Sequence, residues 1–142
     1  MRKQLLFIVF ILMTTIVSAQ KVKFKKNKIF VDKKEFLTYE KGGVFGAIEY
    51  DLIEINSKKR IITLVSNDNG THMNIDDDYS KIRFLTKGEN AEIRGGNLKN
   101  AIRILLKNDV LRKDGTLDES KVELFIKNYD ENISQKTIQI RG

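Results

Sequence analysis

The chain has 142 residues, a formal net charge of +7 at pH 7, and no cysteine, proline or tryptophan. The absence of cysteine excludes disulfides, thiolate metal sites and cysteine nucleophiles, and the absence of proline excludes a proline-rich linker. The charge is unevenly placed, because residues 20–34 contain seven lysines and a single acidic residue, Asp32. The basicity therefore belongs to one segment near the N-terminus and not to the chain as a whole.

Residues 1–19 have the pattern of a secretory signal peptide. A short basic start precedes an unbroken apolar run over residues 5–13, and small residues then lead to Ala19 and Gln20. The run is shorter than the roughly 20 apolar residues that a membrane-spanning helix needs. We expect cleavage between Ala19 and Gln20, with an uncleaved N-terminal anchor as the alternative. We also expect a periplasmic or secreted protein with no transmembrane segment in the mature chain, which forms one domain over residues 20–142.

Alternating apolar and polar residues predict a sheet over about residues 22–94. Asp32-Lys33 is expected to form a tight turn, and Gly42-Gly43 is expected to break the chain. A bulge or turn near Asp51 would reconcile the two apolar faces of the following segment, because a slip of one residue reverses the faces of a strand. The turn signals of the remaining segment divide it into short strands. The sum is an antiparallel meander of about six to eight strands.

The hydrophobic period changes after Gly95-Gly96 and predicts two amphipathic helices. The first helix is expected over about residues 97–108, with Asn97 as its N-cap, and the second over about residues 117–131. Residues 137–140 alternate again and are a possible last strand. Ordering the backbone costs about 1–2 kcal/mol per residue, more than the apolar faces of the two helices can offset alone. We therefore predict one α+β domain with both helices packed on one face of the sheet.

Residues 110–126 have some features of a calcium-binding EF-hand loop. If Gly115 takes the sixth position of such a loop, Arg112 and Lys121 fall on positions that require oxygen ligands. Thr116 and Glu119 instead match a capping box, in which each side chain satisfies an amide at the start of a helix. We therefore predict a corner between two helices and not a calcium site.

A second acidic feature is the run Asp76, Asp77 and Asp78. Clustered carboxylates suit hard cations, but consecutive side chains cannot all point at one ion, and a calcium site needs six or more oxygens. We predict a solvated acidic loop and keep weak calcium binding as the alternative. No cofactor is expected.

The sequence contains no recognisable catalytic set. His72 is the only histidine, and we expect it to be an exposed strand residue and not a general base. Glu49, Asp51 and Glu54 are close in sequence, and neighbouring acids on a strand usually form its solvated face. A carboxylate pair assembled from distant positions, as in glycosidases, remains an alternative.

The lysine segment near the N-terminus has two interpretations. The lysines can form a solvated strand face or guard a sheet edge against aggregation. They can also contact an anionic surface, such as lipid head groups or acidic polysaccharide. The candidate contact residues are Lys21, Lys23, Lys25, Lys26 and Lys28. Nucleic acid is not an expected partner, because export removes the protein from it.

The segments "VSAQ" and "KVKFKKNKIFVDKKEF", together with the C-terminal "NDVLRKDGTLDESKVELFIKNY", resemble small exported proteins of Flavobacterium-like bacteria. The likeness covers most of the chain, although that group often has Asp-Gly where this chain has Asp32-Lys33. The resemblance implies a periplasmic location and implies nothing about catalysis.

These observations lead to a functional hypothesis. We expect a small exported binding or interaction protein of the cell envelope, whose partner is an anionic envelope component or another protein. The alternatives are a hydrolase that uses scattered carboxylates and a periplasmic protein inhibitor.

Overall fold

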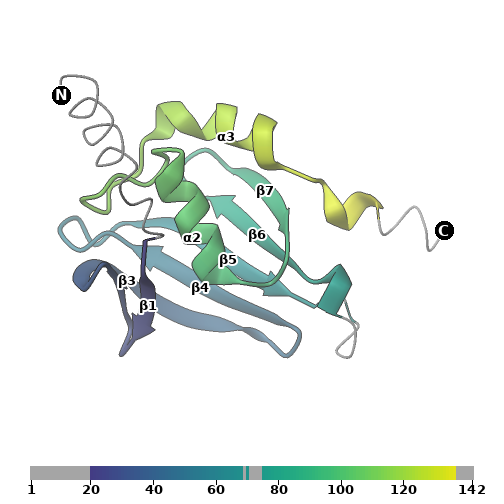
Figure 1. Ribbon diagram of the computed structural model, residues 1–142, viewed down its shortest axis with the longest axis horizontal. Helices are drawn as coiled ribbons and strands as arrows, with labels where there is room; N and C mark the ends of the chain where they lie inside the picture. Colours follow the sequence, from purple (N-terminus) through teal and green to yellow (C-terminus); the bar gives the residue numbers. More distant parts are fainter. Residues whose placement is uncertain (1–19, 69, 71–74, 137–142) are drawn as a thin grey trace, which may run out of the picture.

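The computed structural model describes residues 20–68, 70 and 75–136. Seven antiparallel strands form one sheet, in which their spatial order equals their order along the chain (Figure 1). The strands are β1 (Val22–Lys25), β2 (Lys28–Val31), β3 (Lys34–Val44), β4 (Ala47–Ile53), β5 (Arg60–Asn67), β6 (Tyr79–Phe84) and β7 (Glu89–Arg94). The predicted α+β class with an antiparallel sheet is confirmed.

Helical segments follow the sheet and interrupt one of its loops. Helix α2 spans Leu98–Lys107 and helix α3 spans Val122–Tyr129, so both are shorter than predicted. The 3-10 turns are η1 (Ile75–Asp77) and η2 (Glu119–Lys121), and residues 133–136 form one further helical turn. The expectation of two helices is therefore met only roughly. The strand predicted over residues 137–140 lies outside the described residues.

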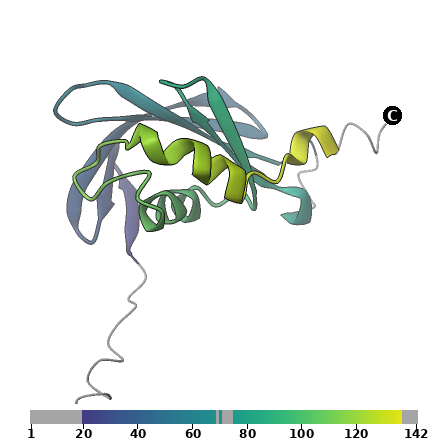
Figure 2. The same ribbon diagram turned by 90° about the horizontal axis from the view of Figure 1, so that it is seen from above.

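The two α-helices lie on the same side of the sheet (Figure 2). Helix α2 contacts β1, β5 and β6, whereas α3 contacts β7. Ile102 and Leu105 of α2 are fully buried against the sheet, and the ring of Phe125 from α3 meets that of Phe84 edge-on, with centroids 6.0 Å apart. Each such side chain contributes about 1.5–3 kcal/mol when removed from water, and this burial holds the helices on the sheet.

The predicted chain break at Gly42-Gly43 is wrong. Strand β3 continues through both glycines to Val44, because Gly42 and Gly43 pair with Glu49 and Ile48 of β4. Gly43 has a φ of +89°, and a Cβ atom at this position would lie 2.3 Å from the carbonyl oxygen of Ala47. The glycine therefore lets the backbone of β3 approach that of β4, and the chain reverses only after Val44.

Three other local predictions are confirmed. Asp32 and Lys33 both have positive φ, which is the backbone of a two-residue hairpin turn between β2 and β3. The strand register shifts between Leu52 and Ile53, next to the expected bulge position. Asn97 caps α2, and its side chain accepts hydrogen bonds from the first backbone amides of the helix.

The sheet curls so that its first strand returns to the helix-covered face. Phe24 of β1 meets the rings of Tyr39 on β3 and Tyr50 on β4, with centroid distances of 5.3 and 5.5 Å, although β2 separates β1 from β3 in the sheet. Arg103 of α2 closes the same corner, because its Nε donates to the carbonyl oxygen of Gln20 at 2.9 Å. This curl brings β1, β4 and α2 together around one groove.

Candidate functional site

The groove lies between the start of α2 and strands β1, β4 and β5. Its volume is about 450 Å³, which falls in the range of small-molecule sites. The lining residues are Phe24, Ile48, Tyr50, Ser66, Gly96, Asn97, Leu98 and Lys99. They come from four separate parts of the chain, so only the folded protein forms the site.

Aromatic and aliphatic side chains form the wall of the groove. Tyr50 is held between Phe24 and Tyr39, whose ring centroids lie 5.5 and 5.4 Å from its own. The Phe24 ring meets Tyr50 edge-on and the Tyr39 ring is tilted against it, and such aromatic contacts add to the stabilisation from burial. Ile48 keeps 37% of its surface exposed and continues the apolar wall toward solvent. The wall is therefore a preformed apolar surface that water can reach.

Polar groups at the groove are few and have fixed positions. The hydroxyl of Ser66 donates to the carbonyl oxygen of Gly96 at 2.9 Å and ties β5 to the segment that leads into α2. Lys99 contributes a cation to the lining, and the Nζ atom of Lys41 lies 6.0 Å from the centroid of the Tyr50 ring. Among the residues that the structure describes, the lining contains no carboxylate. The groove is apolar with a positive rim.

The tip of the β3–β4 hairpin carries a second exposed apolar surface. Val44 is 72% exposed and Phe45 is 87% exposed, and both lie at the end of the hairpin that carries Ile48. Val44 pairs with Ala47, the residue before Ile48, so its side chain lies on the face of the hairpin opposite Ile48. The hairpin tip is therefore a separate candidate contact surface and not part of the groove wall.

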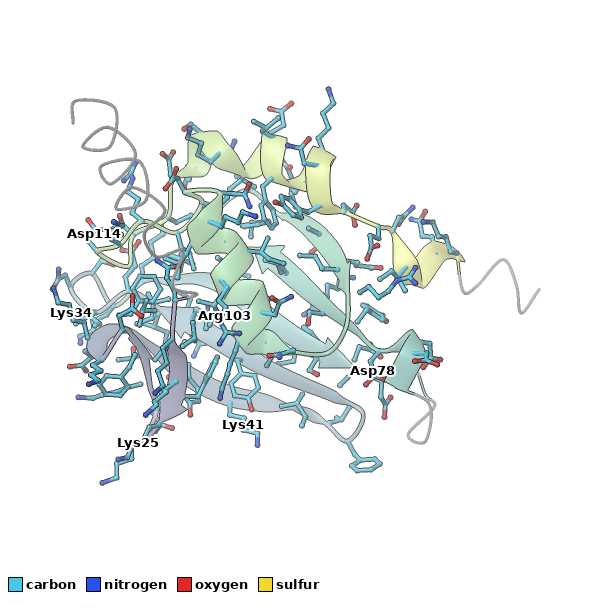
Figure 3. The ribbon with its side chains drawn as sticks, in the orientation of Figure 1. Lys25, Lys34, Lys41, Asp78, Arg103 and Asp114 are labelled. Atoms are coloured by element: carbon cyan, nitrogen blue, oxygen red, sulfur yellow. The ribbon has the colours of Figure 1, made fainter. Side chains whose placement is uncertain are left out.

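The candidate lysines of the N-terminal segment are all exposed. Lys28 forms an ion pair with Glu35 at 2.7 Å. Lys23 and Lys25 point away from the core, whereas Phe24 between them lines the groove. Lys25 and Lys41 project to the same side of the molecule in Figure 3. Part of the predicted basic segment thus lies beside the groove. The sequence alone did not predict this neighbourhood.

The acidic run is split between η1 and the loop after it. Asp76 and Asp77 lie in η1, and Asp78 precedes β6. Over residues 20–68, 70 and 75–136, no group of three or more histidine, cysteine, aspartate or glutamate side chains could hold a metal ion. His72 and Ala19 lie outside the described residues.

The corner at Asp114-Gly115 forms as expected, but its predicted capping box is wrong. The amide and the hydroxyl of Thr116 donate to the carboxylate of Asp114, at 3.0 and 2.6 Å, and the Thr116 side chain does not cap the helix. Gly115 has a φ of +86°, and η2 is capped by Asp118, which accepts from the amide and hydroxyl of Ser120. An isolated β-bridge between Leu111 and Leu117 closes the loop that contains Thr116. The helical residues therefore begin only after Asp118.

Hydrogen bonds at this corner lower the pKa values of two carboxyl groups, Asp114 and Asp118. The hydroxyl and amide of Thr116 hold the pKa of Asp114 below its ordinary value. The hydroxyl of Ser120 does the same to the pKa of Asp118, which also pairs with Arg112 at 3.3 Å. Both carboxylates therefore serve the corner as anions.

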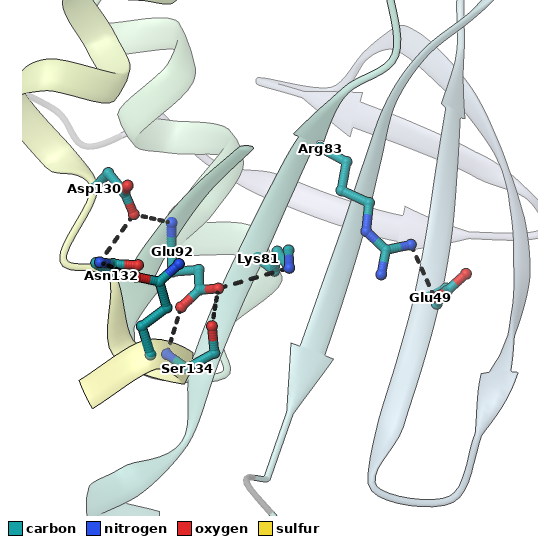
Figure 4. A network of polar contacts seen from close by, with 8 residues as sticks. Glu49, Lys81, Arg83, Glu92, Asp130, Asn132 and Ser134 are labelled. Carbon is teal, nitrogen blue, oxygen red and sulfur yellow. Dashed lines mark hydrogen bonds and ion pairs between the residues drawn. The ribbon is translucent and has the colours of Figure 1, made fainter. Parts of the chain in front are cut away.

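The candidate catalytic carboxylates do not gather at a common point. Asp51 accepts from the hydroxyl of Thr63 at 2.6 Å and pairs with Arg60 at 3.0 Å, and Arg60 also bonds Glu40. Glu49 pairs with Arg83 at 3.3 Å, as Figure 4 shows, and the Glu54 carboxylate accepts from a nearby serine. These acids line neither the groove nor a second cavity of about 320 Å³, which is lined by Gln20, Val31, Asp32, Lys34, Glu35, Phe36, Leu106, Lys113 and Asp114.

A polar network fastens the C-terminal part of the described chain to β7 (Figure 4). Glu92 is only 6% exposed, pairs with Lys81 at 3.6 Å, and accepts two hydrogen bonds from Ser134. The backbone amide of Glu92 donates to Asp130, and its carbonyl accepts from the amide of Glu131. Residues 130–134 thus cover the outer edge of β7, which protects it from pairing with other chains.

Comparisons of the chain with protein-family models, with curated proteins and with solved structures gave no match. Within the part of the chain that the structure describes, no helix is long and apolar enough to cross a membrane.

Proposed function

We propose that the chain is an exported binding protein of the cell envelope and that it recognises its ligand in the groove beside α2. The observation that carries this proposal is the groove itself, an open volume of about 450 Å³ with an ordered aromatic wall. Concave apolar sites with a few fixed polar groups are the usual form of a ligand site. The exposed hairpin tip and the lysines beside it enlarge the available surface.

The chemistry of the groove supports binding more than catalysis. Among the described residues, its lining offers no carboxylate and no histidine, and its titratable groups are the Tyr50 phenol and the Lys99 ammonium. Glu49 and Asp51, the acids nearest in sequence to the groove wall, are held in ion pairs with arginines. The described residues of the groove therefore give a hydrolase no assembled pair of carboxylates.

A protein inhibitor is the second candidate function. It is favoured by the hairpin tip, where Val44 and Phe45 are exposed beyond the close approach at Gly43. An exposed apolar residue at the tip of a hairpin is suited to enter a partner's pocket. This candidate predicts that a Phe45→Ala variant abolishes binding to the partner, whereas groove variants leave that binding intact.

Export forms part of the proposal and has its own test. The N-terminal pattern described above supports removal of residues 1–19. Mass spectrometry of the protein isolated from its native cells should find a mature chain that begins at Gln20. A chain that retains Met1 would contradict cleavage.

Binding in the groove is tested by backbone amide spectra of residues 20–142. We expect an aqueous or an organic extract of the cell envelope to change signals saturably at Tyr50, Ser66 and Lys99, with little change on α3. Spectra that do not change, or that change only on α3, would contradict the proposed site. A Leu124→Ala variant is the control for exposed apolar surface outside the groove, because Leu124 is exposed on α3. This variant should show the same signal changes at the groove as the unchanged protein.

A further inference from the structure

We infer that the groove binds a single-chain anionic amphiphile, an acyl or alkyl chain that ends in a carboxylate, phosphate or sulfate. The inference rests on the proposed function and names the ligand class of the same site. Two features carry it: the shape of the apolar wall and the cations beside it.

The apolar wall suits a flexible hydrocarbon chain. Phe24, Tyr50 and Leu98 line the groove from three different elements, so a chain between them contacts apolar surface on several sides. Ile48, which is 37% exposed, continues the wall toward solvent. A chain longer than the groove therefore keeps contact with Ile48 where it leaves the groove, and only its last carbons return to water.

The cations suit an anionic head group. Lys99 lines the groove, and the ammonium group of Lys41 lies over the ring of Tyr50, so both charges stand next to apolar surface. Both lysines are exposed, so an anionic head group can reach them from solvent while its chain contacts the wall. Asp78 lies beside Gly96 of the lining, because its Oδ2 would lie 3.8 Å from a Cβ at that glycine. Repulsion from this carboxylate disfavours an anionic head group next to Gly96, so we place the head group on the Lys41 side.

Other ligand classes fit the groove less well. A neutral sugar gains most from broad aromatic platforms, and the chain has no tryptophan. In this groove the Tyr50 ring already carries Lys41 near its face and Phe24 at its side. A cationic peptide would meet Lys41 and Lys99 as like charges, which costs binding.

The first test is isothermal titration calorimetry of residues 20–142 with octanoate, decanoate and dodecanoate, each below its micelle concentration. Each added methylene that enters the wall should strengthen binding about fourfold until the wall is filled. The neutral analogue 1-decanol should bind about tenfold more weakly than decanoate. Equal affinity for acid and alcohol, or no dependence on chain length, would overturn the inference.

Variants locate the head group. Lys41→Met and Lys99→Met should each weaken decanoate binding about fivefold or more and should reduce the difference between decanoate and decanol. Lys127→Met on α3 is the matched control, since it removes an exposed lysine far from the groove lining, and it should bind like the unchanged protein. Thermal unfolding of each variant shows whether it remains folded. Unchanged affinity in both folded groove variants would overturn the placement.

Further arms identify the source of the amphiphile. Binding of both decanoate and monomeric lysophosphatidylglycerol supports a site for the chain and any anionic head. Binding only to phosphatidylglycerol vesicles would overturn the groove site in favour of a membrane-surface contact. If no amphiphile binds but an envelope extract still changes the Tyr50 and Ser66 signals, this inference fails and the proposed function stands. If neither changes them, both fail.

Discussion

The carboxylate of Glu92 accepts two hydrogen bonds from Ser134, one from its amide and one from its hydroxyl, both 2.7 Å long. The two residues are 42 positions apart, so the contact joins β7 to the last described helical turn. Burial of Tyr79 raises the pKa of its phenol, and the negative charge of the Glu92 carboxylate raises that pKa further. Glu92 is thus the anchor that holds residues 130–134 over the edge of the sheet.

Removal of this anchor should loosen the C-terminal segment. We expect Glu92→Ala to lower the free energy of unfolding by about 1–3 kcal/mol, because it leaves the half-buried amide and hydroxyl of Ser134 without an acceptor. Urea denaturation measures this loss, and hydrogen exchange should show faster exchange at residues 130–134. Glu89→Ala, at an exposed position on the same strand, should change the free energy of unfolding by less than about 0.5 kcal/mol. Equal effects of the two substitutions would contradict the anchoring role.

Helix α3 offers a direct comparison between neighbouring buried and exposed residues. Phe125 is 2% exposed and stacks on Tyr129 with centroids 4.8 Å apart, whereas Leu124 is 59% exposed. We expect Phe125→Ala to cost about 3–5 kcal/mol in the free energy of unfolding, because it leaves a cavity over Phe84. Leu124→Ala should cost less than about 1 kcal/mol. Chemical denaturation of both variants checks this, and similar losses would contradict the described packing of α3.

The adjacent glycines of β3 provide a matched pair for backbone strain. A Cβ at Gly43 would collide with the Ala47 carbonyl oxygen in a backbone with positive φ, whereas a Cβ at Gly42 meets nothing within 4 Å. We expect Gly43→Ala to destabilise the fold by about 1–3 kcal/mol and to disturb the hairpin tip. Gly42→Ala should be nearly neutral in thermal unfolding. Two variants of equal stability would show that the hairpin does not need this close approach.

The corner before α3 should respond to acid. Because the pKa values of Asp114 and Asp118 are lower in the folded chain than the ordinary value of 3.8, their charged forms stabilise folding above that pH. This contribution is lost as the pH falls through the folded pKa values. NMR titration of both carboxylates should give midpoints below 3.8, and an Asp114→Asn variant should lose less stability on acidification than the unchanged chain. Midpoints at or above the ordinary value would contradict the hydrogen bonds from Thr116 and Ser120.

The sequence predicts the local features of the fold because short-range chemistry determines them. Asp32-Lys33 turns the chain and Asn97 caps α2 because their own backbone and side chains satisfy the geometry. The predicted chain break at Gly42-Gly43 is wrong because both glycines pair with β4, and local sequence cannot tell a chain break from a close approach of two strands. The capping box failed because Thr116 has a nearer partner in Asp114.

The candidate groove could be predicted only in part. The alternation of Ile48, Tyr50 and Leu52 indicates that they share a face of β4, and the lysine segment indicates a basic surface near the N-terminus. The meeting of Phe24 with Tyr50 depends on the curl of the sheet, which no local pattern encodes. Periodicity shows which face a residue takes but not what lies opposite it.

The central claim is that the groove beside α2 is the surface that binds a component of the envelope. Because the chain has no tryptophan, an Ile48→Trp variant places a single reporter on the rim of the groove, and a Leu124→Trp variant places one on α3. We expect an envelope extract to shift the emission of the groove reporter saturably toward shorter wavelength and to leave the α3 reporter unchanged. No shift at the groove, or equal shifts at both positions, would contradict the claim.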